Sequence, residues 1–176
     1  PRSDDRLRMC SAKFPGLDVE LALGELRPHR AGVWSAYLEG AVYMARERWG
    51  DVPGVDIYVD ADLPMARGLS SSASVQSVAL FGLARLLGRT VPVSELIELA
   101  NRSETEYVGV QCGPLDPTAI FLAKQDCILH YDCSDGSFHH LPMPADRVAI
   151  AVMDSGVKRE LAGSAFNQRV QECASS

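Results

Sequence analysis

The chain is 176 residues long, and its composition and charge exclude several classes of protein. With 47% hydrophobic and 23% charged residues, it is typical of one ordinary folded domain and not of a disordered chain. A net charge of −6 argues against nucleic acid or an anionic membrane as a partner. No apolar run approaches the roughly 20 residues of a membrane span, and the stretch "PRSDDRLRMC" lacks the apolar centre of a secretory signal.

The cysteines are odd in number and scattered, with no CxxC pair: Cys10, Cys112, Cys127, Cys133 and Cys173. This pattern indicates reduced thiols rather than a disulfide framework, so we expect a cytoplasmic protein.

The first half of the chain alternates between strand and helix patterns. Alternating apolar and polar residues predict strands at 6–14 and 19–23. Residues 55–63 alternate strictly and predict a strand with one solvent-facing side. Between them, an apolar stripe at helical spacing predicts a helix: Val33, Trp34, Tyr37, Leu38, Ala41, Val42 and Ala45.

The second half predicts further helices, strands and a final helix at 160–176. A helix over 74–88 has its own apolar stripe, ends at Gly88, and is followed by a helix over 94–109 that Ser94 caps. The stripe consists of Val75, Val78, Ala79, Leu83, Leu86 and Leu87. Residues 127–133 and 147–155 predict two more strands, the second apolar enough to be buried. The interleaved pattern predicts an α+β fold, a mixed or antiparallel sheet packed with helices.

Residues 63–75, "LPMARGLSSSASV", place small side chains and hydroxyls where a strand gives way to a helix. Gly68 permits a left-handed turn, and from about Leu69 the chain enters a helix whose first amides lack intrahelical partners. Such amides and the positive end of the helix dipole form an anion site, to which Ser70–Ser72 add hydroxyls. The pattern therefore predicts a phosphate-binding loop; the alternative is a helix cap built from serines.

"GLSSSAS" closely resembles the second motif of the GHMP small-molecule kinases, and its triple serine is most similar to the galactokinase branch. The resemblance implies that the loop wraps the phosphates of ATP and that Ser72 reaches Mg²⁺. Arg67 stands where galactokinases have a small residue, and it either adds charge to the phosphates or points into solvent. The phosphate-binding residues that the resemblance implies are Gly68, Leu69, Ser70, Ser71, Ser72 and Ala73, with Arg67 as a further candidate.

Two carboxylates follow at a spacing of twelve residues, Glu104 and Asp116. Glu104 lies on the apolar stripe of its helix, where a carboxylate is unfavourable unless a cation or hydrogen-bond donors meet it. Taken alone, Glu104 could be a core-edge glutamate paired with an arginine, and Asp116 could be a helix N-cap.

The run "ETEYVGVQCGPLD" resembles the galactokinase segment that links a magnesium-binding glutamate to the catalytic aspartate. The resemblance implies that Glu104 holds Mg²⁺, that Asp116 faces the substrate hydroxyl, and that the Gly113 backbone contacts the sugar. Two departures concern the substrate: Pro117 replaces a glutamine, and Phe166 replaces a tyrosine that touches the sugar.

The resemblance extends almost from end to end and implies the N-terminal domain of a GHMP kinase, a ribosomal-protein-like β-α-β fold, over residues 1–155. Residues 156–176 would begin the second domain. The family's N-terminal sugar-binding motif and its C-terminal glycine-rich motif are absent, so we expect a fragment whose active site is completed by parts outside it. The fragment alone is expected to have little or no activity.

The function that this implies is ATP- and Mg²⁺-dependent phosphorylation of a sugar, galactose or a related aldose, at its anomeric hydroxyl. Two alternatives remain at this stage. One is another GHMP kinase, with an isoprenoid or amino-acid alcohol as acceptor. The other is a non-catalytic sugar or nucleotide sensor that derives from the same fold.

Overall fold

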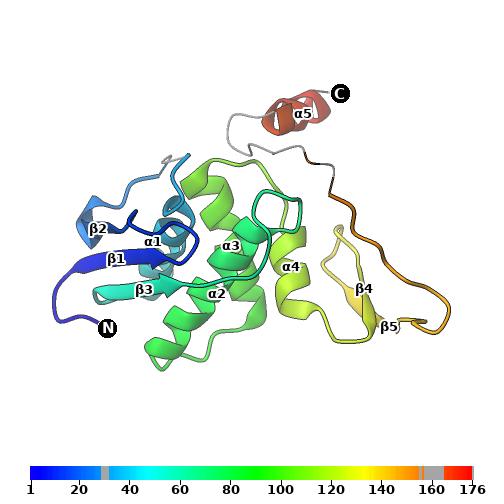
Figure 1. Ribbon diagram of the computed structural model, residues 1–176, viewed down its shortest axis with the longest axis horizontal. Coiled ribbons are helices and arrows are strands. Elements are labelled where there is room, and N and C mark those ends of the chain that lie inside the picture. The colour runs from blue at the N-terminus through cyan, green and yellow to red at the C-terminus, as the bar shows by residue number, and fades with distance from the viewer. Residues whose placement is uncertain (29–31, 155, 157–164, 176) are drawn as a thin grey trace.

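The structure, a computed structural model, describes residues 1–28, 32–154, 156 and 165–175. Strands and helices interleave along the chain, which confirms the predicted α+β class. Figure 1 shows a small sheet at one end of the molecule, helices beside and behind it, and a separate hairpin at the opposite side. Within the described ranges, no helix is long and apolar enough to cross a membrane.

The sheet is mixed, as predicted, and has the strand order β2-β1-β3. Strand β1 (Arg6–Ser11) pairs antiparallel with β2 (Val19–Ala22) and parallel with β3 (Val55–Val59). Alternation explains which side faces the core, because Leu7 and Met9 are fully buried in β1. A short 3₁₀ turn, η1 (Leu23–Glu25), follows β2.

The helices form a layer against this sheet. Helix α1 (Ala36–Trp49) lies behind the strands, and the chain continues through α2 (Ser71–Leu86), α3 (Val93–Arg102), the single-turn π-helix η2 (Ser103–Val108) and α4 (Leu115–Leu122). The segment predicted as one helix over 94–109 is therefore an α-helix that changes to π geometry at its end.

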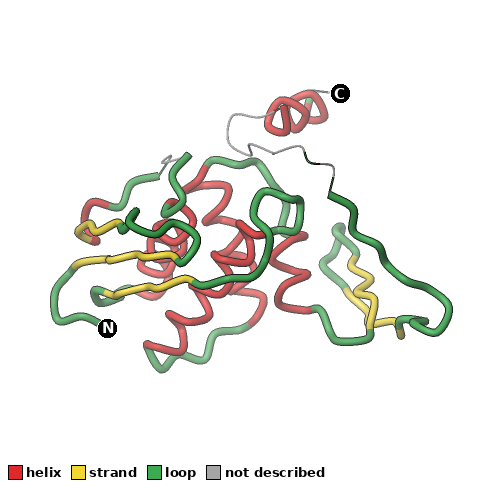
Figure 2. Tube along the Cα trace, viewed as in Figure 1, coloured by secondary structure: helices red, strands yellow, loops and turns green. Residues whose placement is uncertain are grey.

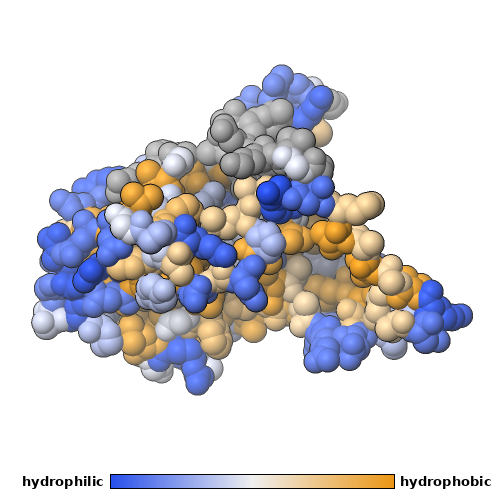
Figure 3. Space-filling view, in the orientation of Figure 1, coloured by the Kyte–Doolittle hydropathy of each residue, from blue (hydrophilic) through white to orange (hydrophobic). Residues whose placement is uncertain are grey.

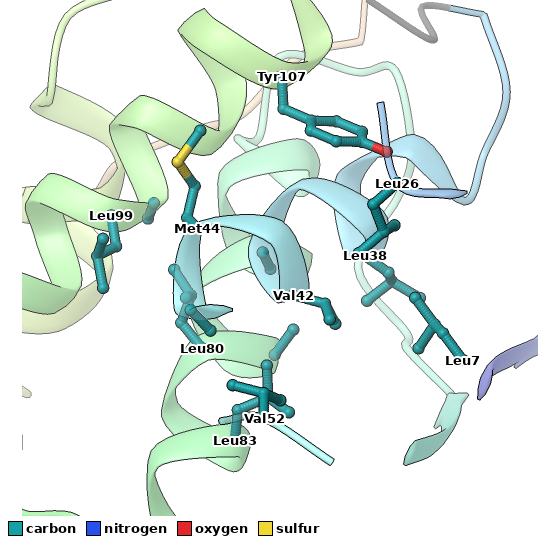
Figure 4. Close-up of a cluster of buried hydrophobic side chains, with 14 of the residues drawn as sticks. Leu7, Leu26, Leu38, Val42, Met44, Val52, Leu80, Leu83, Leu99 and Tyr107 are labelled. Carbon is teal, nitrogen blue, oxygen red and sulfur yellow. The ribbon is translucent and has the colours of Figure 1, made fainter. Parts of the chain in front are cut away.

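One hydrophobic core joins the sheet to the helices (Figure 4). Each of its large aliphatic side chains removes apolar surface from water, which stabilises the fold by about 1.5–3 kcal/mol per fully buried side chain. The buried members from β1, α1, α2 and α3 include Leu7, Leu38, Val42, Met44, Leu80, Leu83 and Leu99.

Helix α2 ends as its sequence predicts. Gly88 has φ +65°, a left-handed conformation that glycine adopts without steric strain. Its amide donates to Arg85 O at 3.1 Å, and the amide of Arg89 donates to Ala84 O at 2.9 Å. These two bonds form a Schellman motif, which satisfies carbonyls that would otherwise lack partners.

Other helix details differ from the predictions. Ser94 does not cap α3, because the helix begins at Val93 and Pro92 holds the N-cap position without a side-chain bond. On α2, Val78 and Leu86 of the predicted stripe are 60% and 43% exposed. Gln76 and Ser77 are buried instead, because α2 packs between other helices and its polar positions cannot all face solvent.

The second half of the chain contains a hairpin of β4 (Cys127–Tyr131) and β5 (Phe138–Pro142). The predicted strand at 127–133 is present, but the one at 147–155 is wrong. Residues 147–154 have no strand, and Ile150 and Val152 are 77% and 70% exposed. An apolar alternation becomes a strand only beside a partner strand, and the described residues offer this segment none.

Apolar side chains consequently gather on the surface near the segment that follows the hairpin (Figure 3). The chain then reaches α5 (Ala165–Ala174). Residues 155 and 157–164 lie outside the described residues, so the predicted domain boundary between 155 and 156 stays a prediction.

Candidate active site

A long loop, green in Figure 2, connects β3 to α2. Several of its residues have left-handed conformations. Gly68 has φ +75°, as its predicted turn requires, while Ala66 and Ser70 have φ +57° and +55°. A non-glycine residue in this region costs about 1–3 kcal/mol, and such strain is concentrated at functional sites. The intrinsic backbone preferences of Ala66 and Ser70 do not favour this conformation, so the surrounding structure must stabilise it.

Helix α2 begins at Ser71, between Leu69, where the chain was predicted to enter the helix, and the start of the predicted apolar helix over 74–88. Ser70 holds the N-cap position, but its side chain makes no capping bond, so the cap interpretation of the serines is wrong for this residue. The first bond of the helix runs from the Ser74 amide to Ser70 O at 2.9 Å. The amides of Ser71, Ser72 and Ala73 have no acceptor within the described residues, which leaves three donors for an anion.

Glu104 is a buried carboxylate near this loop. It lies in η2 and is only 5% exposed. Burial raises the pKa of its carboxyl group, and hydrogen bonding with Ser72 is the largest influence that opposes the rise. Among the described residues, no lysine, arginine or histidine forms an ion pair with Glu104, so the arginine-paired alternative is wrong for this part of the chain.

Asp116 lies in the first turn of α4 and is exposed. Pro114 occupies the N-cap position of α4, which rules out the alternative of a capping aspartate. The charge of Asp116 raises the pKa of the Glu104 carboxyl further, although burial is the larger cause. The structure thus brings Ser72, Glu104 and Asp116 into one neighbourhood.

Gln76 is a member of this neighbourhood that the sequence analysis missed. Its side chain is fully buried, and its Nε2 donates to Ser72 O at 3.2 Å. Its Oε1 has no hydrogen-bond partner within the described residues. The signal was available in the sequence, because positions four apart on a helix share a face.

Cys112 and Tyr37 interact electrostatically with Glu104. Burial, with the charges of Glu104 and Asp116, raises the pKa of the Cys112 thiol to about 12, so the thiol is protonated at neutral pH. Burial and then the charge of Glu104 raise the pKa of the Tyr37 hydroxyl. Both neighbours keep neutral groups beside the carboxylates.

The remaining predicted site residues lie in different surroundings. Leu69 is half-buried before α2 and Ala73 is buried inside it. Arg67 pairs with Asp154, with 2.6 Å between Nη1 and Oδ2. Gly113 lies exposed in the loop before α4, with open space where a Cβ would be. Phe166 belongs to α5, but its side chain lies outside the description.

The donor set fits a hard divalent cation coordinated by oxygen. A buried carboxylate without a cationic partner among the described residues, beside a serine hydroxyl, offers oxygen ligands of the kind that Mg²⁺ prefers. The described residues contain no group of three or more His, Cys, Asp or Glu side chains that could hold a metal by themselves. A cation here would therefore take its other ligands from water or from a bound phosphate.

Comparison with known protein families matches residues 36–124 to the GHMP kinases N terminal domain. The chain is 30% identical over 174 residues to a galactokinase of Ligilactobacillus salivarius (98% of this chain, 45% of the relative). It is 34% identical over 174 residues to a galactokinase of Roseiflexus sp. (98% and 44%). The chain spans somewhat less than half the length of these relatives.

Among solved structures, the chain is similar to Lactococcus lactis galactokinase complexed with galactose. The TM-score is 0.84 at 27% identity, over 98% of this chain and 45% of that one. Its fold also matches Methanococcus jannaschii mevalonate kinase, with a TM-score of 0.68 at 17% identity over 80% and 43%. The family match covers about half of the chain and contains the serine loop, Glu104 and Asp116. The chain therefore belongs to the GHMP kinase family and has the fold of its N-terminal domain.

Proposed function

We propose that this chain forms the N-terminal, catalytic part of an ATP- and Mg²⁺-dependent sugar kinase of galactokinase type. The substrate would be galactose or a related aldose, phosphorylated at its anomeric hydroxyl. The similarity to galactokinases over almost the whole chain supports this function. Residues outside these 176 would complete the sugar site, because the relatives are more than twice as long.

The observation that carries the proposal is the position of Glu104. It is buried near Ser72 and Asp116, and no cation among the described residues pairs with it. A carboxylate in such surroundings needs an opposing charge, and a divalent cation supplies one. In the proposed complex, Glu104 and Ser72 hold Mg²⁺, whose charge neutralises the phosphate oxygens.

The free amides at the start of α2 would bind the phosphate chain, and the left-handed residues before them allow its close approach. Asp116 would orient the anomeric hydroxyl and accept its proton as the oxygen attacks the γ-phosphorus. The bond from that phosphorus to the bridging oxygen breaks, and ADP leaves. Such a transfer depends mainly on alignment and charge neutralisation.

The test is ADP release by the full-length parent protein, measured with a coupled assay across a panel of aldoses. We expect sugar-dependent release with galactose or a close epimer. Asp116→Asn should lower kcat by about 10²- to 10⁴-fold with a much smaller change in the KM for ATP.

Asp126→Asn is the matched control, because it makes the same change at an exposed aspartate near β4. Asp126 has φ +58°, which asparagine tolerates well. This control should retain full activity. If no aldose stimulates ADP release although the protein binds MgATP, the sugar-kinase proposal fails, and another GHMP kinase or a sensor replaces it.

A further inference from the structure

A buried hydrogen-bonded pair connects α1 to η2, the helix that carries Glu104. Glu39 on α1 and Tyr107 on η2 are both 0% exposed. The Tyr107 hydroxyl donates to Glu39 Oε2 at 3.0 Å, and the Ser35 hydroxyl donates to Oε1 at 2.7 Å. The amide of Arg27 donates to the Tyr107 hydroxyl at 3.3 Å. Figure 4 shows the Tyr107 ring above α1 with its hydroxyl directed toward the Leu26 segment.

The two helices approach unusually closely at this pair. A Cβ on Gly40 would lie 2.5 Å from Ser103 Oγ and 3.1 Å from Tyr107 Cβ, so any other residue here would require Ser103 or Tyr107 to shift. The rings of Tyr43 and Tyr107 lie 5.3 Å apart and tilted by 48°. Contact with α1 therefore involves both ends of η2, through Ser103 and Tyr107.

A π-turn depends on such outside support. Its i→i+5 bonds, such as Gly109 N to Glu104 O at 3.0 Å, are rarer and less stable than α-helical bonds. Glu104 lies between Ser103 and Tyr107 in this turn. Because each residue of a helix points in its own direction around the axis, a slip of one residue would turn Glu104 away from Ser72.

We propose that Glu39 and Tyr107 are positioning residues: their buried hydrogen bond fixes η2 against α1 and thereby aims the Glu104 carboxylate at the serine loop. This inference rests on the proposed role of Glu104 in binding Mg²⁺. It assigns to α1 a second task besides core packing.

The chain offers a matched pair of variants for the test. Tyr107→Phe removes only the hydroxyl that donates to Glu39. Tyr43→Phe makes the same change on the adjacent ring, whose hydroxyl contacts Glu47 rather than Glu39. Glu39→Gln is the conservative second variant, because an amide oxygen still accepts a hydrogen bond from Tyr107.

Two measurements on the 176-residue chain, after far-UV circular dichroism verifies folding, decide the matter. Amide hydrogen exchange reports the opening of residues 103–110, and equilibrium dialysis reports binding of the Mn²⁺–ATP complex to the chain. For Tyr107→Phe we expect roughly tenfold faster exchange in 103–110 and about tenfold weaker Mn²⁺ binding, as loss of one buried donor predicts. Tyr43→Phe should change neither by more than about twofold, and Glu39→Gln should have an intermediate effect.

The outcomes separate the inference from the proposed function. Unchanged exchange in 103–110, exchange that rises equally in α1 and α2, or faster exchange with unchanged Mn²⁺ binding would each overturn the positioning role. If the unmodified chain binds no Mn²⁺ with ATP, the proposed metal site fails. Hydrogen exchange still decides whether the pair fixes η2.

Discussion

At the scale of single residues, the burial of Glu104 sets the stability of the fold against the proposed function. A buried carboxylate loses hydration, and the nearby Ser72 and Cys112 donors offset only part of that loss, since the pKa of the group remains raised. Natural proteins tolerate such a residue where its charge is needed for binding. The same residue should therefore destabilise the chain when no cation is present.

Glu104→Gln should raise the free energy of unfolding by roughly 1 kcal/mol at pH 7 in buffer without divalent cations. Burial raises the pKa of the folded-state carboxyl above its unfolded value. The native chain therefore loses stability as pH rises through the window between these two pKa values, and the loss is complete above it. Urea unfolding, followed by circular dichroism across that window, measures the difference in free energy of unfolding between Glu104→Gln and the native chain. This difference should vanish at lower pH.

Glu106→Gln, on the same turn, should change the stability in the opposite direction to Glu104→Gln. Hydrogen bonding to Arg102 lowers the pKa of the Glu106 carboxyl, so its charge contributes stability at neutral pH. The pair is exposed, and its loss should decrease stability by about 0.3–0.5 kcal/mol. A gain in stability from Glu106→Gln, or none from Glu104→Gln, would contradict this account.

Residue-level prediction from sequence succeeded where one local rule decides. Glu104 was found because a charged residue interrupts an apolar stripe, and Gly68 because a left-handed turn favours glycine. Burial of Gln76 was missed, since polar residues are assigned to the solvent side by default. The role of Asp116 remains a prediction, although its charge raises the pKa of the buried Glu104 carboxyl.

At the scale of elements, α2 connects the proposed phosphate site to the core. Its first amides are free for an anion, while its middle packs against α1, α3 and α4. A helix that serves both tasks must begin and end at fixed residues. The Schellman motif at Gly88 sets that end.

Two glycines of this helix should respond to alanine with opposite signs. Gly88→Ala forces a side chain into a left-handed conformation at φ +65° and should decrease stability by about 1 kcal/mol. Gly82→Ala should increase stability by about 0.5–1 kcal/mol, because Gly82 is helical and has open space around it. Thermal unfolding of both variants tests this, and equal shifts in Tm would contradict it.

Elements were predictable where periodicity is uniform and unpredictable where a distant contact decides. The strand predicted from the alternation in 55–63 is present as β3, and it pairs in parallel with β1 in a mixed sheet. The π-turn in 103–108 had no sequence signal, and it lies against Gly40 of α1, a contact between distant parts of the chain that local periodicity does not reveal. The strand predicted at 147–155 failed for a similar reason: its pattern is correct for a strand, but no strand lies beside it in the described part.

At the scale of the whole molecule, the described surface retains apolar features away from the proposed site. A groove of about 360 Å³ runs between β3 and α2. Neither Ser70–Ser72, Glu104 nor Asp116 lines it, so we do not regard it as the active site. Among the described residues β3 pairs only with β1, so its other edge is open, and exposed edges of this kind favour association.

We expect the 176-residue chain to associate in a concentration-dependent manner, measured by sedimentation velocity. Val78 and Phe81, 60% and 50% exposed on α2, supply apolar area next to the open edge. Val78→Lys with Phe81→Lys should suppress the association, because it places charge on that surface. Leu17→Lys, at a residue 58% exposed elsewhere, is the control and should leave it unchanged. A chain that stays monomeric at every concentration would contradict the expectation.

The ion pair between Arg67 and Asp154 ties the serine loop to a segment far along the chain. Both side chains are partly exposed, and a pair of this kind contributes only about 0–1 kcal/mol. If Arg67 binds the phosphates in the proposed complex, it would exchange one anionic partner for another at a small cost in free energy. Such an exchange would release Asp154 from the serine loop, so that binding at the loop would change the contacts of a segment far along the chain.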